Sequence, residues 1–224
     1  ILILLTPIVS FTQTKDLNYS YLALGDSYTI GESVKESERW PVQLSNSLRN
    51  KLNKPVIIAK SGWTTDQLID TLNKINFNKK FDFVSLLIGV NNQYRGRSVE
   101  NFKEGFTILL KKSIEYANYK KERVMVVSIP DWGVTPFAKN KNRTIIGNEI
   151  DAFNKVIHDE CMKNNITFNH NISHKNDCYL SRAINPSFMG MKSILVSPKI
   201  QNPLNIIKWF CWSSHFILCC FALS

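Results

Sequence analysis

The chain contains few cysteines, and their arrangement argues against a disulfide framework. It has five in 224 residues, with Cys161 alone in the body and the other four from Cys178 onward. No C-x-x-C pair and no metal-ligand spacing occurs among them. An odd number of cysteines does not suit an ordered set of disulfides.

Acidic residues are missing from the end of the chain. No Asp or Glu occurs between Cys178 and Ser224, and the last residues, WFCWSSHFILCCFALS, are apolar and cysteine-rich. The rest has the composition of an ordinary globular domain, with 44% hydrophobic residues in the whole chain. We therefore predict one domain over residues 18–175 and an atypical tail over residues 176–224.

The chain has a net charge of +10, but its lysines are scattered among asparagines and isoleucines. There is no basic patch interleaved with aromatic residues, and no helix-turn-helix or zinc-finger spacing. We interpret the charge as solvated surface and expect no nucleic-acid partner.

Apolar runs occur at both ends of the chain. Residues 1–14 begin with an apolar run followed by small and polar residues, which is typical of the remainder of a secretory signal peptide. A first buried strand is the alternative. The signal interpretation predicts export to the periplasm or the extracellular space. Residues 202–223 contain Lys208 and His215, so stable membrane insertion is not expected.

Between these ends, apolar runs alternate with segments of helical periodicity. Strands are predicted over residues 19–25, 55–60, 81–89, 123–130 and 166–169, and helices over 38–53, 64–75, 98–120 and 148–165. Strands that are apolar throughout and separated by helices indicate a parallel sheet covered on both faces. The fold class is therefore α/β.

Polar residues follow the first three predicted strands. Ser27 lies in Gly-Asp-Ser after the first, Gly62 in Ser-Gly-Trp after the second, and Asn91 in Gly-Val-Asn-Asn after the third. Each alone is more often a turn or a helix cap. In a parallel α/β sheet, however, ligands bind beyond the carboxyl ends of the strands. A hydroxyl, a backbone N–H and a carboxamide gathered there would suit ester hydrolysis, which needs a nucleophile and donors to an oxyanion.

These segments resemble four ordered blocks of the SGNH hydrolases, the GDSL-type esterase/lipase superfamily. The blocks are LALGDSYTIG, AKSGWTTDQL, LLIGVNNQYRG and VSIPDWGVTPFA. Tyr28 stands where many members have Leu, and Asn92 where Asp is common. The resemblance covers roughly residues 19 to 169.

The resemblance implies a flavodoxin-like three-layer α/β/α sandwich with a central parallel sheet. It implies Ser27 as the nucleophile, with the backbone N–H groups of Ser27 and Gly62 and the side chain of Asn91 as the oxyanion hole. Asp26 would brace the loop rather than act as a base. The substrates would be acyl or acetyl esters of lipids, sugars, other glycans or small molecules, and no cofactor or metal is implied.

The sequence block in which this family places its Asp and His is missing. It reads D-x-x-H near the C-terminus, and no acidic residue stands three positions before any of the four histidines, which are His158, His170, His174 and His215. His158 falls within a helical pattern and is predicted to lie on the surface, and a replacement base at His170 or His174 stays open. The codons of residues 188–194 permit Gly-Asp-Glu-Ile-His in a shifted frame. We therefore hypothesise a frameshift after about residue 173.

Two functions follow from this sequence. The first is a serine esterase that forms an acyl-enzyme on Ser27, and the second is a non-catalytic SGNH-like protein that lacks the Asp/His pair. Trp63, Tyr94 and Trp132 either line the mouth of a pocket or serve in packing.

Overall fold

The structure is a computed structural model that describes residues 18–48 and 51–169. The expected signal segment, the tail and three of the histidines lie outside these residues. The predicted parallel α/β sandwich is confirmed. A five-stranded sheet has the order β2-β1-β3-β4-β5, and every pairing is parallel. This is the flavodoxin-like strand order.

The strands lie close to their predicted positions. They are β1 (Tyr21–Gly25), β2 (Val56–Ala59), β3 (Phe83–Leu87), β4 (Val124–Val127) and β5 (Thr167–Asn169). Every residue of β1, β3 and β4 is buried. These three strands lie inside the sheet with layers on both faces, which is why they read as continuous apolar runs.

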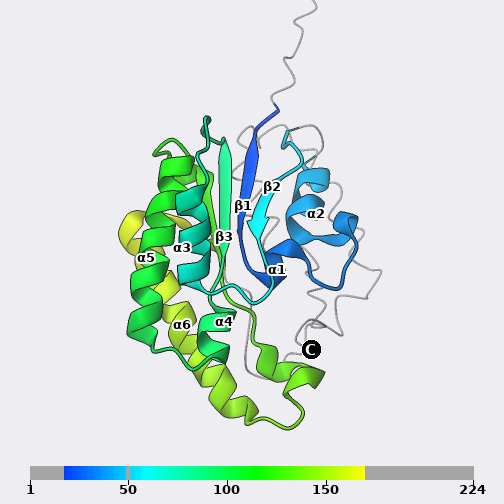
Figure 1. Cartoon of the computed structure of the whole chain (residues 1–224), viewed down its shortest axis with the longest axis vertical. Helices are drawn as coiled ribbons and strands as arrows, with labels where there is room; N and C mark the ends of the chain where they lie inside the picture. Colours follow the sequence, from blue (N-terminus) through cyan, green and yellow to red (C-terminus); the bar gives the residue numbers. More distant parts are fainter. Residues whose placement is uncertain (1–17, 49–50, 170–224) are drawn as a thin grey trace, which may run out of the picture.

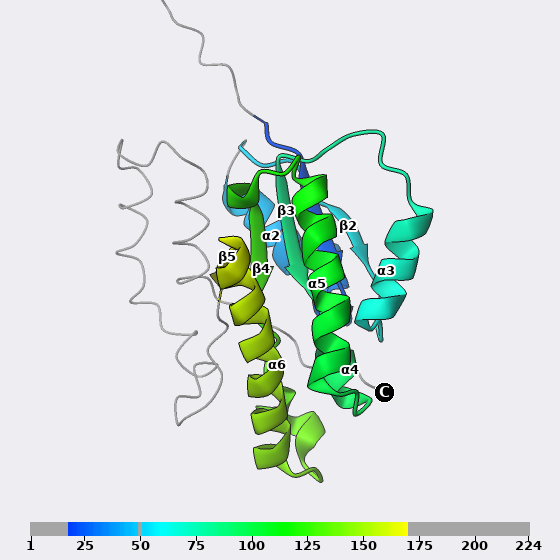
Figure 2. The same cartoon turned by 90° about the vertical axis from the view of Figure 1, so that its left-hand side faces the viewer.

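The helices divide between the two faces of the sheet. α3 (Thr65–Lys74), α5 (Val99–Tyr116) and α6 (Arg143–Asn164) lie together on one face, and α2 (Trp40–Ser47) lies on the other (Figures 1 and 2). The short elements are α1 (Ser27–Ile30), α4 (Val90–Tyr94), η1 (Glu36–Glu38), η2 (Lys121–Arg123), η3 (Trp132–Val134) and η4 (Pro136–Ala138). None of the helices among the described residues has the length and apolar character needed to cross a membrane.

Alternation along the strands produces two hydrophobic cores. In β1, Leu22 and Leu24 join the core under α3, α5 and α6, while Tyr21 and Ala23 join the core under α2. The predicted apolar face of α5 is confirmed, since the following four residues are buried: Phe102, Phe106, Leu109 and Leu110. The ring of Phe102 stacks on Phe153 of α6 at 4.6 Å, so α5 and α6 share one interior.

The helix ends differ from the sequence predictions in two places. α2 occupies only Trp40–Ser47 of the predicted 38–53. α6 begins at Arg143 rather than near residue 148, because the side chain of Asn142 accepts a hydrogen bond from the N–H of Ile145 at 3.2 Å and caps the helix earlier.

Candidate active site

The three candidate residues follow neighbouring strands at one edge of the sheet. Gly25, at the end of β1, pairs with Ala59 of β2 on one side and Leu87 of β3 on the other. The three strands therefore end level with one another. Ser27, Gly62 and Asn91 all come within four residues after these paired ends. The predicted gathering at the carboxyl edge is thus present in the topology, at the lower end of the sheet in Figure 1.

Gly25 explains how the chain turns so sharply before Ser27. A Cβ atom at residue 25 would collide with the hydroxyl of Thr29 and the carbonyl oxygen of Leu87. Only glycine lets α1 fold back closely over the end of β1. Ser27 is the first residue of α1 and is half-buried. Its N–H and hydroxyl make no hydrogen bond to another described residue.

Asp26 caps α1, in agreement with the bracing role expected for it. Its Oδ1 accepts a hydrogen bond from the N–H of Tyr28 at 3.1 Å. Its side chain is fully buried, and Oδ2 has no hydrogen-bond partner among the described residues. Burial raises the pKa of Asp26 to about 7, against the opposing effect of the backbone N–H groups of Tyr28 and Gly89. The carboxyl beside Ser27 therefore titrates near neutrality.

Gly62 occupies the third position of a tight turn between Lys60 and Trp63. The N–H of Trp63 donates to the carbonyl of Lys60 at 3.2 Å, and Gly62 has φ of +77°. A positive φ at this position is the mark of a type II turn and favours glycine. The N–H of Gly62 donates to no other group within residues 18–48 and 51–169. It is therefore a free backbone donor at the edge where Ser27 lies.

Asn91 connects the loop after β3 to the loop that carries Gly62. Its side chain is buried, with 3% of its surface exposed. The Nδ2 group donates to the carbonyl oxygen of Trp63 at 2.9 Å. A carboxamide has two N–H bonds. The bond to Trp63 fixes the orientation of the amide, and the second N–H has no partner in the described part of the chain.

Asn92 has a different and structural role. Its Oδ1 accepts from the N–H of Thr65 at 3.0 Å, and its Nδ2 donates to the Thr65 hydroxyl at 2.8 Å. It therefore holds the first residue of α3. Asn92 stands where the family often has Asp. Its amide can both accept from and donate to the same threonine, and it carries no charge.

Two arginines that the sequence analysis missed hold the loop after β2 and the start of α3. Arg95 donates from Nη2 to the carbonyl oxygen of Gly62 at 2.7 Å. Arg97 donates to both carboxylate oxygens of Asp66, at 2.6 and 3.3 Å. Both arginines follow Asn91 closely in the sequence, but both are polar and at least partly exposed, so no pattern distinguished them from ordinary surface residues.

The aromatic residues flagged at the strand ends have mixed roles. Trp132 is buried, and its Nε1 donates to Gln93 at 2.7 Å, while Gln93 donates to Glu149 of α6 at 2.7 Å. Tyr94 is 42% exposed and lies edge-on to Trp132, with ring centroids 5.4 Å apart. Trp63 is partly buried against the core. Trp132 and Trp63 therefore contribute to packing, and Tyr94 lies at the surface.

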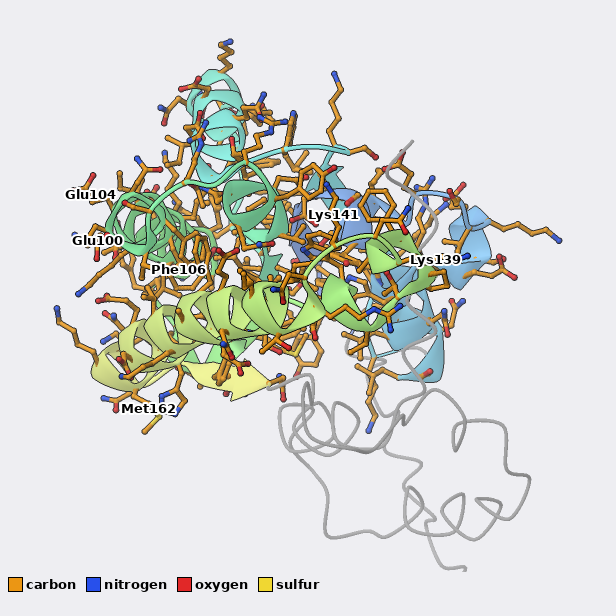
Figure 3. All side chains as sticks on the ribbon, turned by 90° about the horizontal axis from the view of Figure 1, so that it is seen from below. Glu100, Glu104, Phe106, Lys139, Lys141 and Met162 are labelled. Atoms are coloured by element: carbon orange, nitrogen blue, oxygen red, sulfur yellow. The ribbon has the colours of Figure 1, made fainter. Side chains whose placement is uncertain are left out.

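Figure 3 looks onto the end of the molecule where the strands finish. Lys139 and Lys141 come from the segment between η4 and α6, which crosses this end, and both side chains are exposed.

No cluster of three or more His, Cys, Asp or Glu that could hold a metal ion occurs within residues 18–48 and 51–169.

His158 is the sole histidine in the described part of the chain, and it does not belong to this edge. It lies on α6 with 52% of its side chain exposed, as predicted, and its Nδ1 is 3.4 Å from Asp159. Glu149, nine residues earlier on α6, reaches Gln93 near the strand ends. At 1.5 Å per residue, His158 is about 13 Å farther along the helix.

Comparisons with known proteins agree with this architecture. The sequence profile of the GDSL-like lipase/acylhydrolase family matches residues 23–177. No match is found among functionally curated proteins.

Similar solved structures share the fold at low sequence identity. TesA is 18% identical over 66% of this chain and 76% of its own, with a TM-score of 0.52. AlinE4, an SGNH-hydrolase family esterase, is 15% identical over 86% and 93%, with a TM-score of 0.53. Phospholipase A1 from Streptomyces albidoflavus NA297 is 19% identical over 67% and 78%, with a TM-score of 0.51. With the sheet order and the family match over most of its length, the chain belongs to the GDSL-like lipase/acylhydrolase family.

Proposed function

We propose that the chain is a serine esterase in which Ser27 attacks the carbonyl carbon of an acyl ester. The bond between that carbon and the alkoxy oxygen then breaks, the alcohol departs with the serine's proton, and an acyl group stays on the Ser27 oxygen. Water adds to the acyl-enzyme, the carboxylic acid leaves, and Ser27 regains a proton. Neither step needs a metal or a redox cofactor.

The observation that carries this proposal is the set of unpaired donors at the strand ends. The N–H of Ser27, the N–H of Gly62 and one N–H of Asn91 have no partner among the described residues. Each follows the end of a strand that pairs directly with the next. Unpaired donors held rigidly near a nucleophile are suited to the negative charge that forms on the carbonyl oxygen during attack.

The proton of Ser27 needs an acceptor, and we propose that this acceptor is a residue of the segment after β5. His158 is exposed on a distant part of α6. The other three histidines and the tail lie outside the described residues, and none follows an acid at the D-x-x-H spacing. The frameshift hypothesis supplies such a pair in the shifted frame of residues 188–194. Reading the gene tests it, since a stop codon before the shifted histidine contradicts it.

The substrates we propose are acyl or acetyl esters of lipids, glycans or small molecules, met by an exported protein. A second function is favoured by the missing D-x-x-H. Without a general base, the same edge would bind an ester-like or glycan ligand and leave it unchanged. Loss of a triad member costs several orders of magnitude in rate, so the two functions differ greatly in turnover.

The test is hydrolysis of p-nitrophenyl acetate by the chain as written, by Ser27→Ala and by a version with the reading frame restored. Activity of the written chain that Ser27→Ala lowers by about 1000-fold or more supports the esterase. Activity confined to the restored version indicates that the tail has lost its base. Activity that survives Ser27→Ala contradicts the proposed nucleophile.

A further inference from the structure

Two consecutive carbonyl groups in the loop after β2 are held by one face of α4. Gly62 O accepts from Arg95, at 2.7 Å, and Trp63 O accepts from Asn91, at 2.9 Å. Asn91 and Arg95 are four residues apart along α4 and its cap, so their side chains lie on the same side of the helix. The loop with Gly62 is therefore fixed to the loop with Asn91 at two adjacent peptide groups.

We propose that Arg95 is a positioning residue that fixes the Gly62 peptide so that its N–H faces the reacting carbonyl. This inference rests on the proposed esterase function, in which Gly62 supplies a donor to the oxyanion. Arg95 acts through Gly62 and does not itself touch the substrate in this role.

The turn at Gly62 has little restraint of its own. Gly62 has φ of +77°, and the nearest atom to a Cβ built there is Nη2 of Arg95, at 3.6 Å. Gly62 has no side chain to oppose rotation of the peptide group between residues 61 and 62. Such a rotation would replace the inward N–H by a carbonyl oxygen and convert a type II turn into a type I turn. A hydrogen bond to the carbonyl of Gly62 holds the next peptide plane and so opposes this rotation.

The surroundings of Arg95 suit positioning better than general stabilisation. Its side chain is exposed, and it makes no ion pair with a described acidic residue. An exposed hydrogen bond contributes little to the stability of a fold. Arg97, two residues later, pairs with Asp66 and fixes the start of α3 instead.

The test compares Arg95→Ala with Arg95→Lys and with Arg123→Ala, a matched loss of an arginine at the opposite end of the sheet. We expect kcat for p-nitrophenyl acetate to fall about 10-fold or more in Arg95→Ala, with KM within about twofold, since a donor used only in the transition state affects kcat. Lysine at position 95 should restore part of kcat, because one N–H can still reach the carbonyl. Arg123→Ala should leave kcat unchanged.

A second measurement does not depend on activity. The N–H of Trp63 closes the turn on the carbonyl of Lys60 and shares a peptide group with the Gly62 carbonyl, so the quantity to follow is amide hydrogen exchange at Trp63. It should be about 10-fold faster in Arg95→Ala than in the wild type and unchanged in Arg123→Ala. Unchanged exchange, or unchanged kcat in an active protein, would overturn the role of Arg95. If the wild type shows no hydrolysis that depends on Ser27, the esterase proposal fails, while the exchange still decides whether Arg95 holds the turn.

Discussion

Polar groups are hydrogen-bonded to one another at the amino edge of the sheet and partly unpaired at its carboxyl edge. At the amino edge, Asp82 accepts from the N–H and hydroxyl of Ser20 at 3.0 and 2.8 Å, and from Arg123 at 2.8 Å. At the carboxyl edge, Asp26 keeps one carboxylate oxygen without a partner among the described residues, and Ser27 and Gly62 have unpaired N–H groups. One edge joins strands, and the other leaves donors available to a ligand.

The two aspartates show this contrast in their pKa values. Partial burial pushes the pKa of Asp82 upward, but the hydrogen bonds from Ser20 and the Arg123 guanidinium outweigh it and hold the pKa below its ordinary value. Burial without a nearby cation raises the pKa of Asp26 to about 7. The paired aspartate with the lowered pKa and the buried aspartate with the raised pKa therefore lie at opposite ends of the sheet.

The largest effect is expected at the carboxyl edge, from Asn91→Ala. Removing one oxyanion donor typically lowers kcat by about 100- to 1000-fold. The matched control is Asn154→Ala, because Asn154 is equally buried and bonds the N–H and carbonyl of Ile129 at 2.8 and 2.9 Å. Asn154→Ala should cost more stability and less activity. Equal losses of kcat in the two variants would contradict a specific role for Asn91.

The next effect concerns Asp26→Asn and the pH dependence of stability. The folded pKa of about 7 exceeds the ordinary value of 3.8, so the contribution of Asp26 to wild-type stability is fully present below about pH 4 and is lost as pH rises towards 7. Asparagine caps a helix as well as aspartate and carries no charge. Asp26→Asn should gain on the order of 3 kcal/mol over the wild type between pH 4 and pH 8.

Urea denaturation at pH 4 and pH 8 measures this gain. The exposed Asp70 of α3 provides a matched control, and Asp70→Asn should shift stability little at either pH. If the difference between Asp26→Asn and the wild type is the same at both pH values, the buried carboxyl is not protonated as described.

The smallest effect is expected at the amino edge, from Arg123→Ala. The side chains of Arg123 and Asp82 are 27% and 40% exposed, so the pair should contribute about 1 kcal/mol or less. Because the folded pKa of Asp82 is lowered, this contribution is present at pH 7 and is lost as pH falls through that pKa. Thermal unfolding at pH 7 and pH 3 measures it. A loss of kcat in Arg123→Ala would contradict the view that the amino edge serves stability alone.

The sequence allowed the sheet to be predicted but not the contacts that shape its carboxyl edge. Apolar runs such as residues 19–25 reveal buried strands because burial on both faces demands apolar residues throughout. α4 has only five residues, too few for a periodic pattern. It was not predicted for that reason, although the sequence placed Asn91 after the third strand.

Arg95 shows why the rest of the site could not be foreseen. Its hydrogen bond to Gly62 joins residues 33 apart in the chain and uses a backbone oxygen, which every residue has. No residue type marks such an acceptor in a sequence. The raised pKa of Asp26 also depends on three-dimensional burial, which its position beside Ser27 does not reveal.

The most direct test of the convergence of Ser27, Gly62 and Asn91 is NMR of the full chain labelled with an alkyl phosphonofluoridate. The phosphonyl oxygen on Ser27 would stand in for the oxyanion. We predict that the backbone N–H signals of Ser27 and Gly62 and the side-chain N–H signal of Asn91 all shift downfield on labelling, and that Ser27→Ala is not labelled. Labelling at another residue, or an adduct on Ser27 that leaves any of the three signals unmoved, would contradict the convergence.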